Sequence, residues 1–378
     1  MKFKLVCRVA AMVAAAAAFG STTLAADRQP RYDFSTIDTE LSRECRSGEF
    51  SGVVLVRAHG RTLYEHECGE ADLTNHIPIT RDTRFRIHST SKMMTALAVM
   101  RLVEQGKIGL DRSIADYIPD VPKEWKPVTV RTLLNHTSGI PDYTELMLYQ
   151  FRADQPSAMR LTLAALTPDQ RKLKTNPGEH FNYNNFGFEL LADIAAHVTG
   201  EPFAQLVQEL VLTPAGMKSA SLEMPYIIDG HPVGVTEDGL ALGYNGSPAK
   251  LEQTIPWSFI QLGAGSVRAS VDDFVALDQA LSEGKIVSPE TWNLMTSDPV
   301  HPSAGDHNPP DRGFGLGVIL ESVDGVRMQG HTGGTNGYIS DFERYPDDGA
   351  MMVALTNRGF VKTTWLRDGV AKVLKQAR

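Results

Sequence analysis

Residues that favour β-strands gather near both ends of this chain, whereas helical patterns fill its middle. Near the start, β-rich runs at 52–57 and 62–67 are joined by a four-residue turn, which predicts a hairpin. Near the end, four more runs predict strands at 315–321, 326–331, 338–344 and 351–356. Strands this far apart in sequence bury their apolar faces by pairing with one another. We therefore expect one antiparallel sheet built from both ends of the chain.

Helical patterns flank and interrupt these strands. Residues 33–46 and 364–376 predict helices at the two ends, and apolar residues at three- and four-residue spacing predict a helix over 89–105. A further helix is predicted over 188–198. The expected fold class is α+β, with an antiparallel sheet flanked by N- and C-terminal helices and a mainly helical insertion beside it. The sheet part is expected at about 31–85 and 282–378, and the helical part at about 86–281.

The N-terminus has the pattern of a secretory signal peptide. Lys2, Lys4 and Arg8 precede an alanine-rich apolar run at 9–19, and small residues follow up to Ala25. We expect cleavage of residues 1–25, a mature domain at 26–378 without a membrane-spanning segment, and an exported, periplasmic or secreted protein. The alternative is an uncleaved N-terminal anchor, which the short apolar run disfavours.

Charge excludes one class of partner. The chain carries a formal charge of −8, and removal of the three basic residues in 1–25 gives −8 − 3 = −11. Nucleic-acid binding needs a basic face, so we expect no nucleic-acid partner and instead a small-molecule or peptide substrate.

Two cysteines remain after loss of Cys7 with the signal. Cys45 ends a predicted helix and Cys68 ends the second strand of the hairpin, so the two could form a disulfide or remain as buried free thiols. The histidines lack metal-ligand spacing, and we expect neither a metal nor another cofactor.

The candidate nucleophile is a serine at the start of the clearest helix. In the run Ser89-Thr90-Ser91-Lys92, residues 89 and 92 share one helix face, so the hydroxyl and the amine can meet one turn apart. Burial would favour the neutral amine, which could then act as a base. Alone, this S-x-x-K pattern is weak, because Ser89 could simply cap the helix and two other matches begin at Ser247 and Ser282.

Two further motifs strengthen that interpretation. Tyr183-Asn184-Asn185 is the only Y-x-N, and His331-Thr332-Gly333 is the only K/H-S/T-G. In this order the three motifs resemble the serine β-lactamase and penicillin-binding superfamily, especially class C β-lactamases and D-alanyl-D-alanine carboxypeptidases. Intervening stretches agree as well, among them LLNHTSGI (133–140), GSVRASVDDF (265–274) and GHTGGTNG (330–337).

The resemblance implies a β-lactamase/transpeptidase-like fold and a role for each matched residue. Ser89 would be acylated, and Lys92 and Tyr183 would carry protons. Asn185, His331, Thr332 and Gly333 would bind substrate. The backbone N–H groups of Ser89 and Gly334 would form the oxyanion hole.

The sequence departs from the β-lactamase pattern at one of these positions. His331 stands where β-lactamases of this group usually have lysine. A partly charged histidine there would give weak, pH-dependent carboxylate binding. We expect a D-alanyl-D-alanine carboxypeptidase-like or D-amino-acid peptide amidohydrolase. The alternatives are a carboxylesterase or weak β-lactamase, and a penicillin-binding sensor that stays acylated. The sequence gives no role for His88.

Overall fold

The computed structural model describes residues 32–142, 158–223, 226–228, 231–233, 238–254, 262–303, 312–335 and 337–378. The predicted signal peptide at 1–25 lies outside the described residues. Tyr32–Arg378 forms one compact unit. Within the described part of the chain, no helix combines the length and the apolar character needed to cross a membrane.

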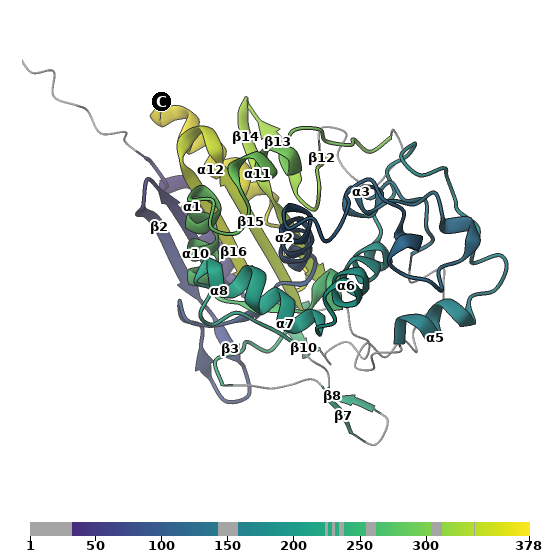
Figure 1. Cartoon of the computed structure of the whole chain (residues 1–378). Helices are drawn as coiled ribbons and strands as arrows, with labels where there is room; N and C mark the ends of the chain where they lie inside the picture. Colours follow the sequence, from purple (N-terminus) through teal and green to yellow (C-terminus); the bar gives the residue numbers. More distant parts are fainter. Residues whose placement is uncertain are drawn as a thin grey trace, which may run out of the picture. The chain divides into compact units, whose positions relative to one another are not determined.

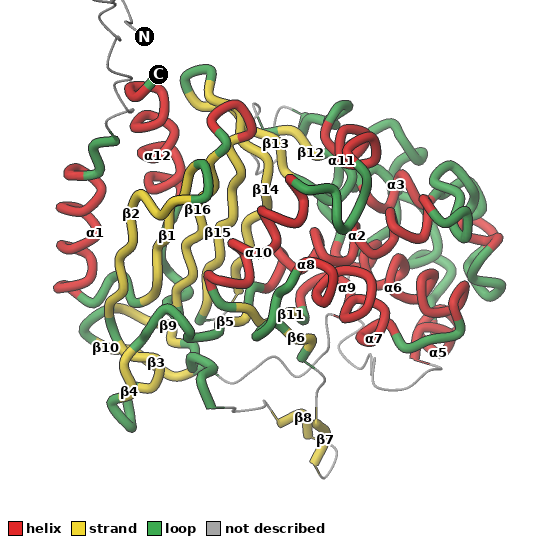
Figure 2. The backbone as a smooth tube through the Cα atoms, turned by 60° about the vertical axis from the view of Figure 1, so that its left-hand side comes forward, coloured by secondary structure: helices red, strands yellow, loops and turns green. Residues whose placement is uncertain are grey.

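Strands from both ends of the chain form one seven-stranded antiparallel sheet, as predicted (Figures 1 and 2). The N-terminal strand β1 pairs directly with the last strand, β16, so that Gly52 lies opposite Thr356. The strand order is β12-β13-β14-β15-β16-β1-β2. The bounds are β1 Gly52–Ala58, β2 Arg61–Cys68, β12 Gly313–Phe314, β13 Ile319–Val323, β14 Val326–Thr335, β15 Tyr338–Tyr345 and β16 Ala350–Thr356.

Strand β1 is apolar at almost every position because both faces of the sheet are covered. Val54 and Val56 pack in a cluster with the terminal helices α1 (Ser35–Ser47) and α12 (Thr364–Ala377). Val53 and Leu55 pack in the larger cluster that contains the helical part of the molecule. Alternate residues of one strand therefore join the two layers on either side of the sheet.

The prediction of one strand at 315–321 is wrong. The chain instead forms a tight hairpin, in which Phe314 at the end of β12 lies opposite Ile319 at the start of β13. Gly317 in the turn has φ of +74°, and a Cβ there would lie 2.3 Å from the Cβ of Ala96. The sequence reads as a strand, but this glycine lets the turn press against a buried helix.

That buried helix is α2 (Ser91–Glu104), which lies between strand β14 and helices from the middle of the chain (Figure 1). It is preceded by a 3₁₀ turn, His88–Thr90, so the helix predicted to begin at Ser89 begins two residues later. Helix α6 (Asn185–Thr199) packs against it and includes the segment predicted at 188–198. The other helices are α3 Val130–Leu134, α5 Ala158–Ala165, α7 Phe203–Val207, α8 Thr213–Ala215, α9 Leu262–Gly265, α10 Val271–Ser282 and α11 Pro289–Thr296, with a π-helical turn at Gln208–Leu212.

Short strands among the described residues form four smaller sheets. One of them has the strand order β5-β11-β6. Its strand β5 is separated by a single residue from the 3₁₀ turn at His88–Thr90. The bounds are β3 Glu70–Asp72, β4 Ile77–Pro78, β5 Phe85–Arg86, β6 Ser221–Leu222, β7 Tyr226–Ile228, β8 His231–Val233, β9 Tyr244–Ser247, β10 Lys250–Gln253 and β11 Val267–Ala269.

Candidate active site

Ser89 lies in the 3₁₀ turn that links β5 to the N-terminus of α2. The preceding residue, His88, has φ of +45°, a left-handed backbone that non-glycine residues seldom adopt. Such a conformation costs about 1–3 kcal/mol and persists only where its surroundings fix it. Here the His88 ring packs 5.5 Å from the ring of Tyr338, and its buried Nε2 has no hydrogen-bond partner among the described residues. His88 thus forms part of the bend that presents Ser89.

Lys92 is the centre of the hydrogen-bond network around Ser89. Its side chain is fully buried, and its Nζ lies 3.1 Å from Ser89 Oγ. The same nitrogen donates to Asn185 Oδ1 at 2.9 Å and to the Ala264 carbonyl at 2.9 Å. Three acceptors match the three N–H groups of an ammonium, and the neutral amine keeps the bonds to Asn185 and Ala264 while its lone pair faces Ser89 Oγ. The structure thus brings the S-x-x-K pair and the asparagine of Y-x-N together.

Asp142 fixes the orientation of Asn185. Its carboxylate accepts from the backbone N–H groups of Asn185 and Phe186, each at 2.9 Å, and from Asn185 Nδ2 at 3.0 Å. Because Nδ2 is held by Asp142, Oδ1 must face Lys92. The carboxylate also lies at the N-terminus of α6, where negative charge is favourable.

A second carboxylate, Glu189, fixes the other acceptor of Lys92. Glu189 is buried, and its two oxygens accept from the N–H groups of Gly263 at 3.0 Å and Ala264 at 2.9 Å. Thr95 Oγ1 donates to the Gly263 carbonyl at 2.6 Å. These bonds hold helix α9 where the Ala264 carbonyl can accept from Lys92.

Tyr183 lies beside Lys92, with Nζ 5.0 Å from the centre of its ring. His136 stacks on the Tyr183 ring with the two ring centres 4.4 Å apart, and its Nδ1 accepts from the backbone N–H of Asn184 at 3.1 Å. Asn184 caps α6 through Oδ1, which accepts from Gly187 N at 2.6 Å. His136 therefore holds the loop that carries Tyr183.

The strand that carries the H-T-G motif packs against the turn that carries Ser89. Strand β14 pairs with β13 only as far as Gly330, so within the described residues His331–Thr335 has no strand partner on that side. A Cβ at Gly333 would lie 2.1 Å from the Ile87 carbonyl oxygen and 2.9 Å from Thr90 N. Only glycine therefore permits this close approach of β14 to the backbone around Ser89.

Two hydroxyl groups fasten this contact. Ser340 Oγ donates to the Ile87 carbonyl at 2.7 Å and lies 2.8 Å from Thr90 Oγ1, which in turn donates to the His331 carbonyl at 3.2 Å. The turn that carries Ser89 is thereby joined to both β14 and β15.

Alternation along β14 separates the residues that the sequence grouped as substrate-binding. His331 and Gly333 lie on the side of the sheet that carries Ser89. Thr332 pairs with Asp341 and lies on the side covered by α12. Gly334, proposed for the oxyanion hole, is exposed in the segment of β14 beyond Gly330.

The histidines near Ser89 are neutral at neutral pH. Burial and the nearby Lys92 lower the pKa of His331 to about 3. Burial, with Arg86 and Lys92, lowers the pKa of His88 to about 3, and burial lowers that of His136 well below its usual value. The expected partial charge on His331 is therefore wrong. Its Nδ1 lies 2.6 Å from the Thr332 carbonyl, which can only accept, so the neutral ring carries its proton on Nδ1 and leaves Nε2 as an acceptor.

Sequence reasoning missed the residues that hold the site together. Asp142, Glu189 and Ser340 belong to none of the three motifs, and Thr90 fills an unspecified position of S-x-x-K. One of them carried a usable signal, because Glu189 lies four residues after Asn185 and so shares its helix face. The others act through contacts between segments distant in sequence.

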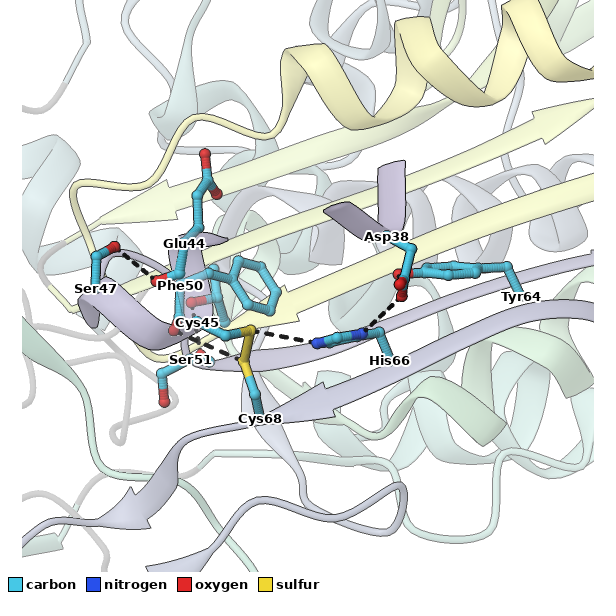
Figure 3. The surroundings of a disulfide bond; sticks show 10 residues. Asp38, Glu44, Cys45, Ser47, Phe50, Ser51, Tyr64, His66 and Cys68 are labelled. Atoms are coloured by element: carbon cyan, nitrogen blue, oxygen red, sulfur yellow. Dashed lines mark hydrogen bonds and ion pairs between the residues drawn. A yellow bond between two sulfur atoms is a disulfide. The ribbon is translucent and has the colours of Figure 1, made fainter. Parts of the chain in front are cut away.

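Metal-ligating side chains gather at one place in the described parts of the chain, and it is not beside Ser89. That group is Cys45, His66 and Cys68. The two cysteines form a disulfide, which resolves the alternatives left open by the sequence (Figure 3).

Comparisons with known proteins agree with this architecture. Penicillin-binding protein 4* of Bacillus subtilis is 30% identical over 316 residues, which cover 82% of this chain and 68% of that protein. A D-aminopeptidase of Brucella anthropi is 28% identical over 321 residues, covering 81% of this chain but only 56% of that protein. This chain thus spans little more than half the length of that relative.

A solved structure, the octameric penicillin-binding protein homologue from Pyrococcus abyssi, has the same fold. It superimposes with a TM-score of 0.76 at 22% identity, and the match covers 91% of this chain and 78% of that one. Residues 37–373 match the family described as Beta-lactamase. With this match extending over nearly the whole described unit, the chain belongs to the β-lactamase family and is a serine hydrolase of that family.

Proposed function

We propose that this protein is an exported amidohydrolase that acts on peptides or amides of D-amino acids through an acyl-enzyme on Ser89. The observation that carries the proposal is the buried Lys92 Nζ, 3.1 Å from Ser89 Oγ and held by two further acceptors. A serine hydroxyl is a weak nucleophile unless a neighbouring group takes its proton, and Lys92 is placed to do so.

In the proposed acylation step, Ser89 Oγ attacks the substrate carbonyl as its proton passes to the Lys92–Tyr183 pair. The oxyanion receives hydrogen bonds from the backbone N–H groups of Ser89 and Gly334. Tyr183 then protonates the leaving nitrogen, the C–N bond breaks, and the acyl group stays on Ser89. In deacylation the same pair takes a proton from water, which releases the acid and restores the hydroxyl.

The state of His331 favours one group of substrates. A neutral, 2% exposed histidine supplies no positive charge for a substrate carboxylate. We therefore expect the better substrates to be amides and peptides whose recognition does not depend on a C-terminal carboxylate at position 331. The similarity to a D-aminopeptidase supports this choice over a carboxypeptidase.

A matched substrate series tests the proposal. We would compare D-alanyl-D-alanine, its C-terminal amide and the L,L stereoisomer of that amide, with a p-nitrophenyl ester and a fluorescent penicillin as additional probes. The proposal predicts the highest kcat/KM for the D,D amide and loss of turnover in Ser89→Ala. Higher kcat/KM for the free acid would indicate a carboxypeptidase, and turnover of the ester alone would indicate an esterase. Stable penicillin labelling without turnover of any of these substrates would indicate a binding or sensor protein. Each of those three results would contradict the proposed substrate class.

Export is the other part of the proposal. It rests on the basic residues and the alanine-rich run within residues 1–25. Expression of the full chain in a Gram-negative host, followed by fractionation and N-terminal sequencing, should give a periplasmic product that begins near residue 26. A full-length product retained with the membrane would contradict it.

A further inference from the structure

The disulfide lies between the N-terminal helix and the edge strand of the sheet, apart from Ser89. On α1, Asp38 and Cys45 are seven residues apart, which places them on one face two turns from each other. On β2, His66 and Cys68 are two residues apart and share the face that meets α1. The fold thus collects four side chains with metal-binding chemistry at one place (Figure 3).

His66 is held between a carboxylate and a sulfur atom. Its Nδ1 lies 3.4 Å from Asp38 Oδ1, and Tyr64 OH donates to the same oxygen at 3.0 Å. Its Nε2 lies 3.4 Å from Cys45 Sγ, and Figure 3 shows the ring bridging the two groups. A carboxylate accepts but does not donate, so the neutral ring carries its proton on Nδ1 and directs the Nε2 lone pair at the sulfur.

The contact between His66 Nε2 and Cys45 Sγ contributes little stabilisation while the disulfide is intact. A disulfide sulfur has no proton to donate to the lone pair, and it is a weak acceptor for a protonated ring. After reduction the same three positions offer two thiols and an oriented imidazole. That is a Cys₂His ligand set, and a carboxylate behind the imidazole is the usual outer partner of a histidine bound to zinc.

We propose that reduction of the Cys45–Cys68 disulfide converts this cluster into a binding site for a soft divalent ion such as Zn²⁺. The ligands are Cys45 Sγ, Cys68 Sγ and His66 Nε2, and Asp38 orients the imidazole. A water molecule completes a tetrahedral shell. The bound ion then takes over the role of the disulfide in joining α1 to β2.

The chemistry balances with a thiol or phosphine as reductant. A dithiol reduces the disulfide to two thiols and itself becomes a disulfide. With a phosphine, water supplies the two protons and its oxygen forms the phosphine oxide. Binding of Zn²⁺ then releases the two thiol protons to solvent, so affinity should rise with pH.

The potential ligand atoms lie close together in the fold. The three potential ligand atoms already lie within 4.8 Å of one another. Bonds of about 2.3 Å to sulfur and about 2.0–2.1 Å to nitrogen bring such atoms into one tetrahedral shell. Cys45, His66 and Cys68 are all partly exposed, so reductant and ion can reach them from solvent.

The test uses the purified full domain and Co²⁺ as a spectroscopic substitute for Zn²⁺. The protein is reduced with tris(2-carboxyethyl)phosphine, and its fold is checked by near-ultraviolet circular dichroism before Co²⁺ titration. We expect one Co²⁺ per reduced chain, with a thiolate-to-cobalt charge-transfer band and the visible bands of tetrahedral cobalt. The oxidised protein should show neither, and Zn²⁺ should displace the cobalt.

Variants assign the ligands. His66→Gln should remove the site, and Asp38→Asn should weaken binding by about 10–100-fold, the usual effect of losing an outer carboxylate partner. His76→Gln is the matched control, because His76 Nδ1 also contacts a carboxylate, Glu70 Oε1 at 3.3 Å, on an exposed turn. It should bind Co²⁺ as the parent does.

Three results would overturn the proposal. They are an absence of cobalt uptake by folded reduced protein, uptake that His66→Gln leaves unchanged, and loss of the near-ultraviolet spectrum on reduction. The last would mean that the reduced chain has no assembled site. None of these results depends on hydrolytic activity at Ser89.

Discussion

Replacement of Gly333 by alanine tests how closely β14 must approach the nucleophile. The added Cβ would lie 2.1 Å from the Ile87 carbonyl oxygen, whereas an ordinary contact begins at 3.4 Å. Strand and turn must therefore separate by about 1 Å, and a displacement of that size at a catalytic group can reduce the rate about 100-fold. Forcing an extra carbon into a packed contact should also lower the free energy of unfolding by about 1–3 kcal/mol.

The matched control is the next residue in the chain. A Cβ at Gly334 would meet the end of the Ile339 side chain at 2.9 Å, and that flexible group can move aside. Gly334→Ala also keeps the backbone N–H proposed for the oxyanion hole. We would measure acylation by a fluorescent penicillin or an activated ester, together with urea unfolding. Near-parental acylation in Gly333→Ala, or an equal loss in both variants, would refute the argument from close approach.

Three further changes test the network around the nucleophile. Lys92→Met should slow acylation by about 10²–10⁴-fold, as expected for loss of a positioned base, and circular dichroism should show a retained fold. A fully active Lys92→Met would refute the assigned role. Asp142→Asn offers one acceptor oxygen where three N–H groups need acceptors, so Asn185 can turn and the Lys92 contact weakens. We expect lower kcat and about 1–3 kcal/mol less stability by urea unfolding, and an unchanged kcat would contradict this. His331 has a folded-state pKa of about 3 and an unfolded value near 6.5, so the unfolded state binds more protons between these values. Its contribution to stability is complete above about pH 6.5 and is lost as the pH falls, by about 1.4 kcal/mol per pH unit. Comparison of urea unfolding of the parent and His331→Gln from pH 7 to 4 isolates this slope, and identical slopes would show that the histidine is not buried in its neutral form.

Much of the fold could be predicted because the spacing of apolar residues indicates where the main strands and helices lie. Strand β1 reads as an apolar run interrupted only by Arg57, and the pairing of chain ends follows from the need to bury such a strand on both faces. The hairpin at Gly313–Val323 could not be read in this way. Its residues have strand-like composition, and the turn at Gly317 exists because a helix lies against it, which is a property of the tertiary structure.

The same distinction applies to the site. The contact between Ser89 and Lys92 follows from their spacing on one turn, which depends on local geometry alone. The prediction that Asn185 and His331 lie near Ser89 came from the family resemblance. The neutral state of His331 and the carboxylates of Asp142 and Glu189 depend on burial and on contacts across the fold, which motif spacing does not encode.

Identification of the acylated residue tests the central claim most directly. The protein would be incubated with a slowly hydrolysed penicillin, quenched in acid and digested, and the labelled peptide sequenced by mass spectrometry. We predict a single adduct on Ser89, slower formation in Lys92→Met, and no adduct in Ser89→Ala. An adduct on another residue, or full hydrolytic activity in Ser89→Ala, would contradict the proposed chemistry.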